Sequence, residues 1–373
     1  MSLPNLPEIS FTDLDPASVE SAIITTYEGI AEKTLYDGDP VRLFLVSLAY
    51  LITMQNVAID ATGKQNLLAY ATEASLDHLG ALMDTPRMGK KPAITKERYT
   101  LAEPLAWAVL IPQGSRVTTG SGGLVFITDR TAEIPAGKLH VDIPVTCTVA
   151  GIRGNGLVPG QINKMVDVIP YVKSVSNVTV SELGADVEED EPYRRRIQLA
   201  PEKFSVAGSE GAYRYHTLSV HQDIVDCAVW RPRPGWVDVR PILKGGELPG
   251  EELLKKVREH LSGKRVRPLS DNLNVAAPEL AEYRIKGSWT LRRSNAPLAE
   301  SIQARVAEAV EEYRLWQRSM PGRDINPTRL VSLMESAGAK HVPLIEPEFR
   351  KLEDRFIARE TSVEMEFLGV EDE

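Results

Sequence analysis

The sequence predicts a multidomain α+β protein: an N-terminal helical segment, an antiparallel β domain, and two strand–helix–strand modules. Three observations predict this fold class. Apolar residues recur at helical spacing over 15–83, short β-rich runs broken by Gly and Pro fill 93–175, and strands then alternate with helices. The 373 residues also exceed what one core usually fills, since domains are typically on the order of 100–150 residues. We therefore expect four regions, at 1–88, 89–182, 183–278 and 279–373.

Composition and charge narrow the functional classes. The chain is 43% hydrophobic and 25% charged, with a formal net charge of −9. This acidic balance argues against non-specific binding to nucleic acid or anionic lipid, both of which favour a basic surface. Cys147 and Cys227 lie far apart beside apolar or β-branched residues. They could pair, but buried thiols of a protein made in a reducing compartment are favoured. The N-terminus, MSLPNLPEIS, does not resemble a secretory signal.

The N-terminal segment is expected to be helical and to bind a partner. Ser18 can cap a first helix, and the run at 41–54, after a DGDP break, is apolar almost all round. That run contains Arg42 and is about two-thirds of the roughly 20 residues that a membrane span needs, so we expect a buried helix and no membrane contact. Later domains could cover it. We favour a second protein chain, bound through Leu43, Phe44, Leu48, Leu51, Leu67, Leu76 and Leu79.

The β domain is expected to follow a basic linker, TPRMGKKPA, at 85–93. The turns PQGS, GSGG, PAGK and GNG separate the expected strands, which lie at 105–111, 116–119, 124–128, 139–150 and 171–180. Frequent turns without a helical period predict an antiparallel sandwich or a barrel-like domain. The glycines of GIRGNGLVPG fit neither a dinucleotide-binding loop nor a Walker A loop, and we expect them in hairpin turns.

The junction between the β domain and the first module carries the strongest local charge pattern. Asp186 is expected to cap a helix whose first turn holds the acids of 188–191, with Arg194, Arg195 and Arg196 one turn further on. The acids could instead form a metal site or an acid/base pair, but the Gly and Glu positions of a calcium loop are missing. We interpret the junction as a solvated helix start and a hinge, whose arginine face contacts a neighbouring copy.

The two C-terminal modules share a strand–helix–strand plan, which suggests related α+β layers. A helix starts near Glu210 and carries Tyr213. The further elements are expected at 224–230, 237–243, 250–261, 273–276, 283–291, 298–316, from Pro327, at 341–345 and at 361–367. Three tryptophans lie near turns or helix ends, where aromatic side chains serve either as interface anchors or as core packing at domain edges: Trp230, Trp236 and Trp316.

No convincing catalytic constellation is found. His216 and His221 are five residues apart, off a common helix face, although Cys227 nearby leaves a metal cluster conceivable. The S-G-K stretch at 262–264 is one residue short of the S-x-x-K nucleophile motif, and G-x-S-x-G is absent from the sequence. We therefore expect neither a cofactor nor a resident metal.

Several stretches resemble one known family. NLLAYATEASLDHLGALMDTPR (66–87) resembles the "lL-yAtG--LD-lG" segment of the baseplate J-like family of contractile tails. The junction SNVTVSELGADVEEDEPYRRR resembles that family's "N-----GG-D-E-----R-R" element, and VRPLSDNLNVAAP (266–278) its "rvRPltd-v-v-aP" strand. GNGLVPGQI is similar to the turn in its β domain, and GRDINPTRLVSLMESAG extends the match weakly. Glu73 and Leu183 replace two family glycines, which affects only local turn geometry.

The resemblance implies a structural wedge subunit in the baseplate of a contractile phage tail or a phage-derived injection particle, assembled in a bacterial cytoplasm, and not an enzyme. It implies that the N-terminal helices bundle with a second wedge protein. It also implies C-terminal parts that meet other copies in a ring around the central spike, with sheath-end and spike-hub proteins as neighbours. Two alternatives stay open: a cell-wall hydrolase acting through carboxylates of 186–191, and a glycan-binding tail component acting through the β domain.

Overall fold

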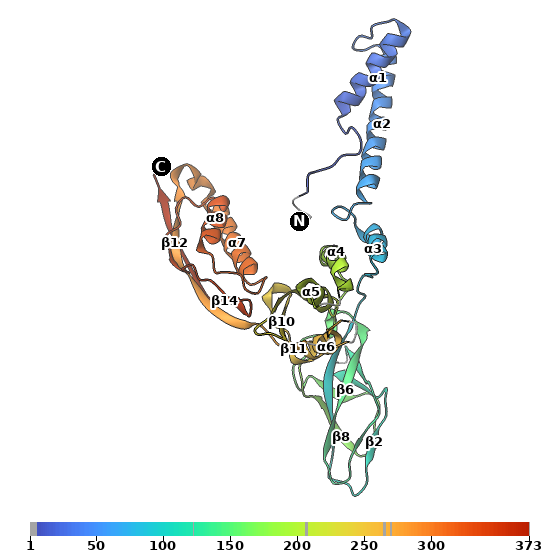
Figure 1. The fold of residues 1–373 in the computed structure, drawn as a ribbon, viewed down its shortest axis with the longest axis vertical. Helices are drawn as coiled ribbons and strands as arrows, with labels where there is room; N and C mark the ends of the chain where they lie inside the picture. The colour runs from blue at the N-terminus through green and yellow to red at the C-terminus, as the bar shows by residue number, and fades with distance from the viewer. Residues whose placement is uncertain (1–5, 122, 206–207, 264–265, 269–270, 373) are drawn as a thin grey trace. The chain divides into compact units, whose positions relative to one another are not determined.

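The computed structural model describes residues 6–121, 123–205, 208–263, 266–268 and 271–372 (Figure 1). The chain divides into two compact units. One unit is Met1–Arg87 with Glu189–Ala200, and the other is Met88–Glu188 with Pro201–Glu373. Parts of four stretches singled out above lie outside the described residues: the first five residues of MSLPNLPEIS, one glycine of GSGG, the lysine of S-G-K, and the Leu-Ser of VRPLSDNLNVAAP.

The first unit is helical, as predicted, and its first two helices begin at a proline that follows a capping aspartate. The helices are α1 (Pro16–Ala31), α2 (Pro40–Lys64), α3 (Glu73–Leu82) and α4 (Asp190–Leu199). Asp15 accepts a hydrogen bond from the backbone N–H of Ala17, and Asp39 accepts one from Val41, so the predicted cap at Ser18 is wrong. The reason is the proline at the first helical position: it needs no N–H there, so the preceding aspartate becomes the cap.

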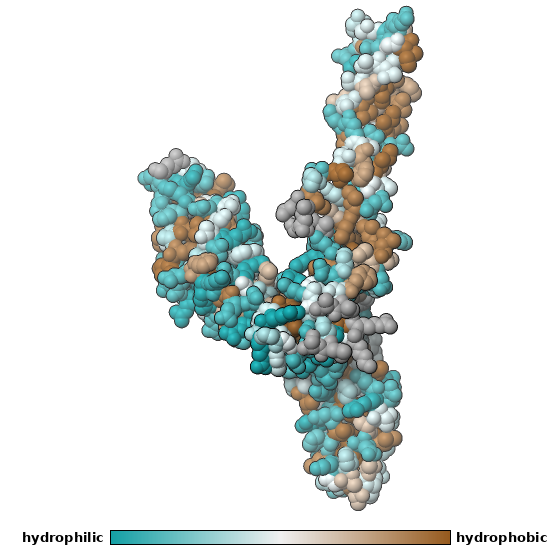
Figure 2. Space-filling view, in the orientation of Figure 1, coloured by the Kyte–Doolittle hydropathy of each residue, from teal (hydrophilic) through white to brown (hydrophobic). Residues whose placement is uncertain are grey.

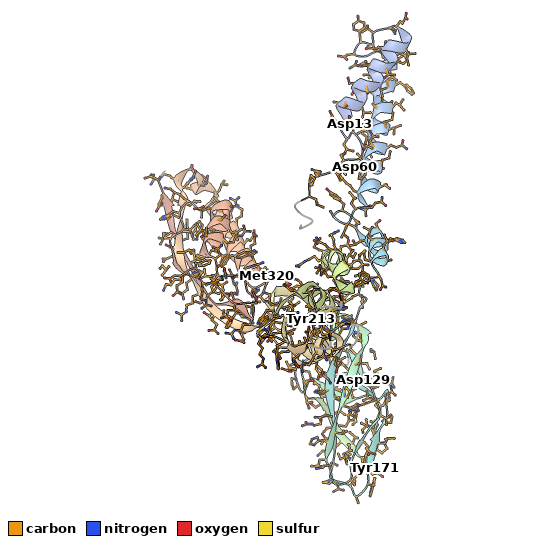
Figure 3. All side chains as sticks on the ribbon, in the orientation of Figure 1. Asp13, Asp60, Asp129, Tyr171, Tyr213 and Met320 are labelled. Atoms are coloured by element: carbon orange, nitrogen blue, oxygen red, sulfur yellow. The ribbon has the colours of Figure 1, made fainter. Side chains whose placement is uncertain are left out.

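The segment that precedes α1 is fastened along α2 (Figure 3). The carboxylate of Asp60 accepts a hydrogen bond from the backbone N–H of Phe11 at 2.9 Å and pairs with Lys64 at 2.8 Å. The side-chain amide of Asn56 donates to the carbonyl of Asp13 at 2.9 Å. These contacts hold the N-terminal segment against one side of α2.

The β domain is a nearly closed antiparallel barrel, which confirms the barrel-like prediction. Its main sheet has the order β7-β3-β4-β6-β1-β8, and β2 pairs with β5. The edge strands β7 and β8 meet where the N–H of Ile162 donates to the side chain of Asn177 at 2.9 Å. The strands are β1 (Pro92–Leu101), β2 (Val109–Ile111), β3 (Arg116–Thr119), β4 (Val125–Thr128), β5 (Ala132–Ile134), β6 (His140–Ala150), β7 (Ile162–Met165) and β8 (Val172–Asn177).

Three of these strands are absent from the sequence prediction: β1, β5 and β7. The most consequential is β1, which lies between β6 and β8 in the main sheet. Its side chains alternate between the interior and the solvent, but a charged residue, Glu97, occupies an interior position among exposed Lys96 and half-buried Arg98. Because residues 96–98 are all charged, the sequence does not show this alternation. The GIRGNGLVPG stretch also differs from a plain hairpin, because Ile152–Gly154 forms a 3₁₀ turn.

The interior of the barrel holds an unpaired carboxyl group. Glu97 is 0% exposed, and neither of its carboxylate oxygens has a hydrogen-bond partner among the described residues. The side chain lies among an apolar core that includes Tyr99, Phe126 and Ile143. Burial disfavours the charged form and raises the pKa of Glu97 to about 9. The glutamate is therefore a neutral acid in the folded barrel near neutral pH.

Both C-terminal modules are mixed α+β layers, as predicted. In the first, β9 (Ile224–Trp230) runs antiparallel and β11 (Asn272–Val275) parallel to β10 (Trp236–Leu243), with helices α5 (Glu210–Leu218) and α6 (Glu251–Leu261). Tyr213 of α5 donates its hydroxyl hydrogen to Asp271 at 2.9 Å inside this module (Figure 3).

The last module has helices α7 (Ala299–Gln317) and α8 (Pro327–Ala337) on one face of a three-stranded sheet (Figure 1). The sheet order is β13-β12-β14, with β12 (Glu279–Arg292) parallel to β14 (Phe356–Glu371) and antiparallel to β13 (Leu344–Glu346). The last strand is much longer than the predicted 361–367. Helix α7 buries the residues that its periodicity selects, Ile302, Val306, Val310 and Tyr313.

Candidate functional site

Helix α2 leaves most of its apolar side chains exposed. A narrow stripe of Leu45, Ala49 and Thr53 is buried on the side where α1 packs, whereas Phe44 is 67% and Leu51 is 62% exposed. Figure 2 shows hydrophobic residues along this helix. Leu43, Leu48, Tyr50, Met54, Val57 and Ile59 are exposed as well. The helix is apolar almost all round, as predicted, but the prediction that it is buried is wrong within this chain.

Helix α2 is also longer than its apolar run. It has 25 residues because the helix continues past Met54 to Lys64. Among the described residues it is the one helix that meets the length and composition of a membrane span, which corrects the estimate from the sequence. Length and composition do not separate a membrane span from a helix that a protein partner covers. The ion pair of Asp60 with Lys64 lies in its last turn.

Helix α4 packs on α3 through a fully buried tyrosine. Tyr193 lies among Ala71, Leu76 and Ile197, and its hydroxyl donates to the carbonyl of Thr85 at 2.8 Å. The guanidinium of Arg87 lies 4.6 Å from the ring centroid. Leu76 is therefore part of this internal core and is unavailable to a partner, which corrects its place in the predicted partner surface. Leu67 and Leu79 are half-buried in the same region.

Two of the three junction arginines are buried inside the first unit. Arg194 donates to the carbonyls of Leu68 and Ala71, at 2.7 and 2.6 Å, and Arg196 donates to the carbonyl of Pro86 at 2.8 Å. A guanidinium has five N–H donors, so it can satisfy backbone carbonyls that end near it. The prediction of one exposed arginine face is wrong for Arg194 and Arg196. Arg195 is exposed, and its contact with a neighbouring copy stays a prediction.

The junction acids bind the chain's own backbone. Helix α4 begins at Asp190 with Glu189 as its N-cap, so the predicted start at Asp186 is wrong. Asp190 accepts a hydrogen bond from the N–H of Glu73 at 3.0 Å and pairs with Arg87 at 2.7 Å. Glu188 is buried and accepts from the N–H of Met88 at 3.0 Å. The helix starts late because the residues before it pair with residues 88–91.

Hydrogen bonds join Leu183, at the start of the segment 183–188, and the neighbouring Lys91 to residues 220–221. Lys91 donates to the carbonyl of Val220 at 2.7 Å, and the buried ring of His221 lies 3.2 Å from the carbonyl of Leu183. The N–H of Asp223 donates to Nδ1 of His221 at 3.2 Å, so Nε2 carries the hydrogen that faces Leu183. Burial lowers the pKa of His221, which favours this neutral form. The hinge predicted here stays a prediction.

The histidine and cysteine cluster that the sequence left conceivable does not form among the described residues. His216 packs against the ring of His260 at 5.6 Å between centroids, whereas the ring of His221 contacts the carbonyl of Leu183. Cys147 and Cys227 are both buried and free, as favoured from the sequence. In the part of the chain that the structure describes, no group of three or more His, Cys, Asp or Glu side chains could hold a metal ion.

The three tryptophans are half-buried, each beside an arginine. The guanidinium carbons of Arg240, Arg233 and Arg323 lie 5.6, 4.1 and 4.3 Å from the ring centroids of Trp230, Trp236 and Trp316. Trp316 also packs against the core of the last module. These positions combine edge packing with partial exposure, and an interface role for the tryptophans stays a prediction.

The Tyr193 hydrogen bond gives a direct test of how α4 is held. We expect Tyr193→Phe to speed hydrogen exchange of the α4 amides by about tenfold, because a buried carbonyl left without its donor costs about 1–3 kcal/mol. Exchange measured by mass spectrometry on the full chain reports this opening. Tyr36→Phe is the matched control, since Tyr36 is exposed. Equal exchange in both variants would show that the hydroxyl contributes little to the docking.

Comparisons with known proteins agree on one family. Family models match three stretches: the Baseplate J-like N-terminal domain at 37–93, the Baseplate J-like protein barrel domain at 98–184, and the Baseplate J-like central domain at 205–277. Baseplate protein J of Escherichia phage P2 is 35% identical over 170 residues, which are 45% of this chain and 55% of that protein. The match thus spans about half the length of that relative.

Similar solved structures include the cryo-EM structure of the anti-feeding prophage (AFP) baseplate, 6-fold symmetrised, in which one chain aligns with a TM-score of 0.44 and 15% sequence identity. The alignment covers 92% of this chain and 90% of that chain.

Proposed function

The chain belongs to the baseplate J-like family, and we propose that it is a structural subunit of the baseplate of a contractile tail or injection particle. One observation carries the proposal: the exposed apolar face of α2. Soluble proteins rarely leave a contiguous apolar patch of this kind uncovered, and such patches mark sites of association. The subunit would act by binding and holding neighbours, and no catalytic step is part of the proposal.

The partner of α2 is proposed to be a helical wedge protein. Phe44, Leu48 and Leu51 follow the i, i+4, i+7 spacing, so their side chains form one stripe along the helix. A stripe of this kind packs against an apolar stripe of another helix. The acidic net charge and the ion pair at the end of α2 favour a protein partner over an anionic membrane. Further copies of the chain, arranged in a ring around the spike, would contact the C-terminal modules.

The hydrolase alternative gains no support from the geometry. A cell-wall hydrolase would need carboxylates that converge on a substrate, but Glu188 and Asp190 each accept hydrogen bonds from the chain's own backbone. The proposed localisation is accordingly the baseplate of the particle, with assembly in the cytoplasm of a bacterial host.

Co-expression tests the proposal directly. We expect the full chain made alone to associate non-specifically, and we expect co-expression with the product of a neighbouring tail gene to give one defined complex. The reason is that the partner covers apolar surface that otherwise drives aggregation. Size-exclusion chromatography with light scattering measures both states. A monodisperse single chain whose α2 amides are fully protected from hydrogen exchange would contradict the proposal.

A further inference from the structure

Strand β14 is an edge strand of its sheet. It pairs with β12 on one side, and no other strand of the described residues pairs with the opposite side, where the carbonyl of Phe356 at the strand start accepts from the N–H of Gly322. An open strand edge presents a row of N–H and C=O groups that can pair with another extended chain. Proteins usually keep such edges short, so a long open edge points to a partner.

A groove of about 370 Å³ lies between α7 and the sheet beside β14. Val363, Met365 and Phe367 occupy alternate positions of β14 and form its apolar side together with Trp289, Val306, Ala307 and Val310. Gln303, Glu311 and Arg314 of α7 complete the lining. Side chains alternate between the two faces of a strand, so these three all face the helix layer. Val363 is exposed, and Met365 and Phe367 are only partly buried. The groove therefore offers apolar surface to side chains of an added strand.

The other face of β14 is acidic. Glu364 and Glu366 stand at the alternate positions, and both are exposed. Lys286 of β12 approaches Glu364 at 3.6 Å, but both side chains are more than half exposed, so this pair is weak. Glu360 is different, because it is bound by Arg314 at 2.7 Å inside the module. Glu364 and Glu366 thus carry negative charge that the described residues of the last module pair only weakly.

We propose that the open edge of β14 binds an extended segment of another protein in which apolar residues alternate with lysine or arginine. The apolar residues enter the groove, the basic residues lie beside Glu364 and Glu366, and backbone hydrogen bonds extend the sheet by one strand. A second β14 does not fit, because its own glutamates would face like charges across the new pair. The inference rests on the proposed structural role only for the expectation that a partner exists.

A peptide with this alternation tests the proposal on the full chain. Fluorescence anisotropy of labelled KVKVKVK should show binding at least about tenfold tighter than that of EVEVEVE, a difference of about 1.4 kcal/mol. The same basic peptide, N-methylated at every second residue, cannot form the backbone ladder and should lose binding. Equal binding of the methylated and unmethylated peptides would reduce the effect to charge attraction and would overturn strand addition.

The variant Glu364→Lys/Glu366→Lys provides a second readout. Because both side chains are exposed, the fold should persist, and the preference should reverse toward EVEVEVE. An unchanged preference would overturn the proposed site. Protection of β14 amides that rises with the concentration of the chain alone would instead assign the edge to a second copy, and would also overturn it. Rescue by co-expression depends on α2 and does not depend on either outcome.

Discussion

The double variant Phe44→Glu/Leu51→Glu is expected to stay monodisperse when made alone and to lose complex formation with the neighbouring tail protein. Both side chains are mostly exposed in the single chain, so the substitutions should leave the helix intact. In a complex they would bury two carboxylates without partners, which costs several kcal/mol, and binding should weaken by at least about 100-fold. Light scattering of the chain alone and co-purification of the pair measure the two effects.

A charge placed elsewhere separates the α2 face from a general effect on solubility. Val168→Glu is the control, because Val168 is 84% exposed but belongs to the β domain. It should leave both co-purification and the self-association of the single chain unchanged. Co-purification of the double variant at the level of the unmodified chain would exclude the α2 face as the partner surface.

The second large effect concerns the stability of the β domain. We expect this stability to fall as the pH rises, and we expect Glu97→Gln to remove the dependence on pH. The folded barrel raises the pKa of Glu97 to about 9, above its ordinary value of 4.5. Folding therefore favours the protonated form of Glu97. The contribution of this group to the free energy of unfolding is fully present below pH 4.5 and is lost as the pH rises toward 9. Since one pKa unit corresponds to about 1.36 kcal/mol, the loss between pH 5 and pH 8 is on the order of 4 kcal/mol.

Glutamine is a neutral isostere of the protonated acid. Glu97→Gln should match the unmodified chain at pH 5 and exceed it by a few kcal/mol at pH 8. Labelling of the buried thiol of Cys147 in urea, read by mass spectrometry, reports unfolding of the β domain separately from Cys227 in the next module. The exposed Glu103→Gln serves as the control. A parallel loss of stability with pH in both variants would show that Glu97 is not the group responsible.

The sequence was sufficient where a residue's periodicity and its burial agree. Helix α7 buries Ile302 and Val306 as its spacing predicts, and strand β12 (Glu279–Arg292) includes the whole alternating run expected at 283–291. The sequence does not indicate strand β1, because Glu97 is charged and yet its side chain lies inside the barrel. Burial of an unpaired carboxyl group in an apolar core is unfavourable, so a sequence pattern assigns a glutamate to the surface and not to the interior.

The sequence does not predict the contacts of α4, for a related reason. Arg194 and Arg196 look like solvent-facing charges on a short helix, but their guanidinium groups satisfy backbone carbonyls that lie more than a hundred positions earlier in the chain. Local spacing carries no information about which distant carbonyls need a donor. The start of the helix could not be predicted from the acids at 188–191 for the same reason. The residues before Asp190 pair with residues 88–91, and this pairing decides where the helix begins.

The hydrogen bond of Tyr193 to Thr85 also sets an order of events during synthesis. These two residues are 108 positions apart, with the entire β barrel encoded between them. At the usual rate of translation, about 5–20 s pass between the emergence of α3 and that of α4. During this interval the N-terminal helices lack the element that closes their core. The barrel strands emerge within the same interval, and all of them are present near its end, because β8 ends at Asn177 and α4 begins at Asp190. The barrel can therefore fold before α4 emerges, and the N-terminal helices gain their final anchor only afterwards.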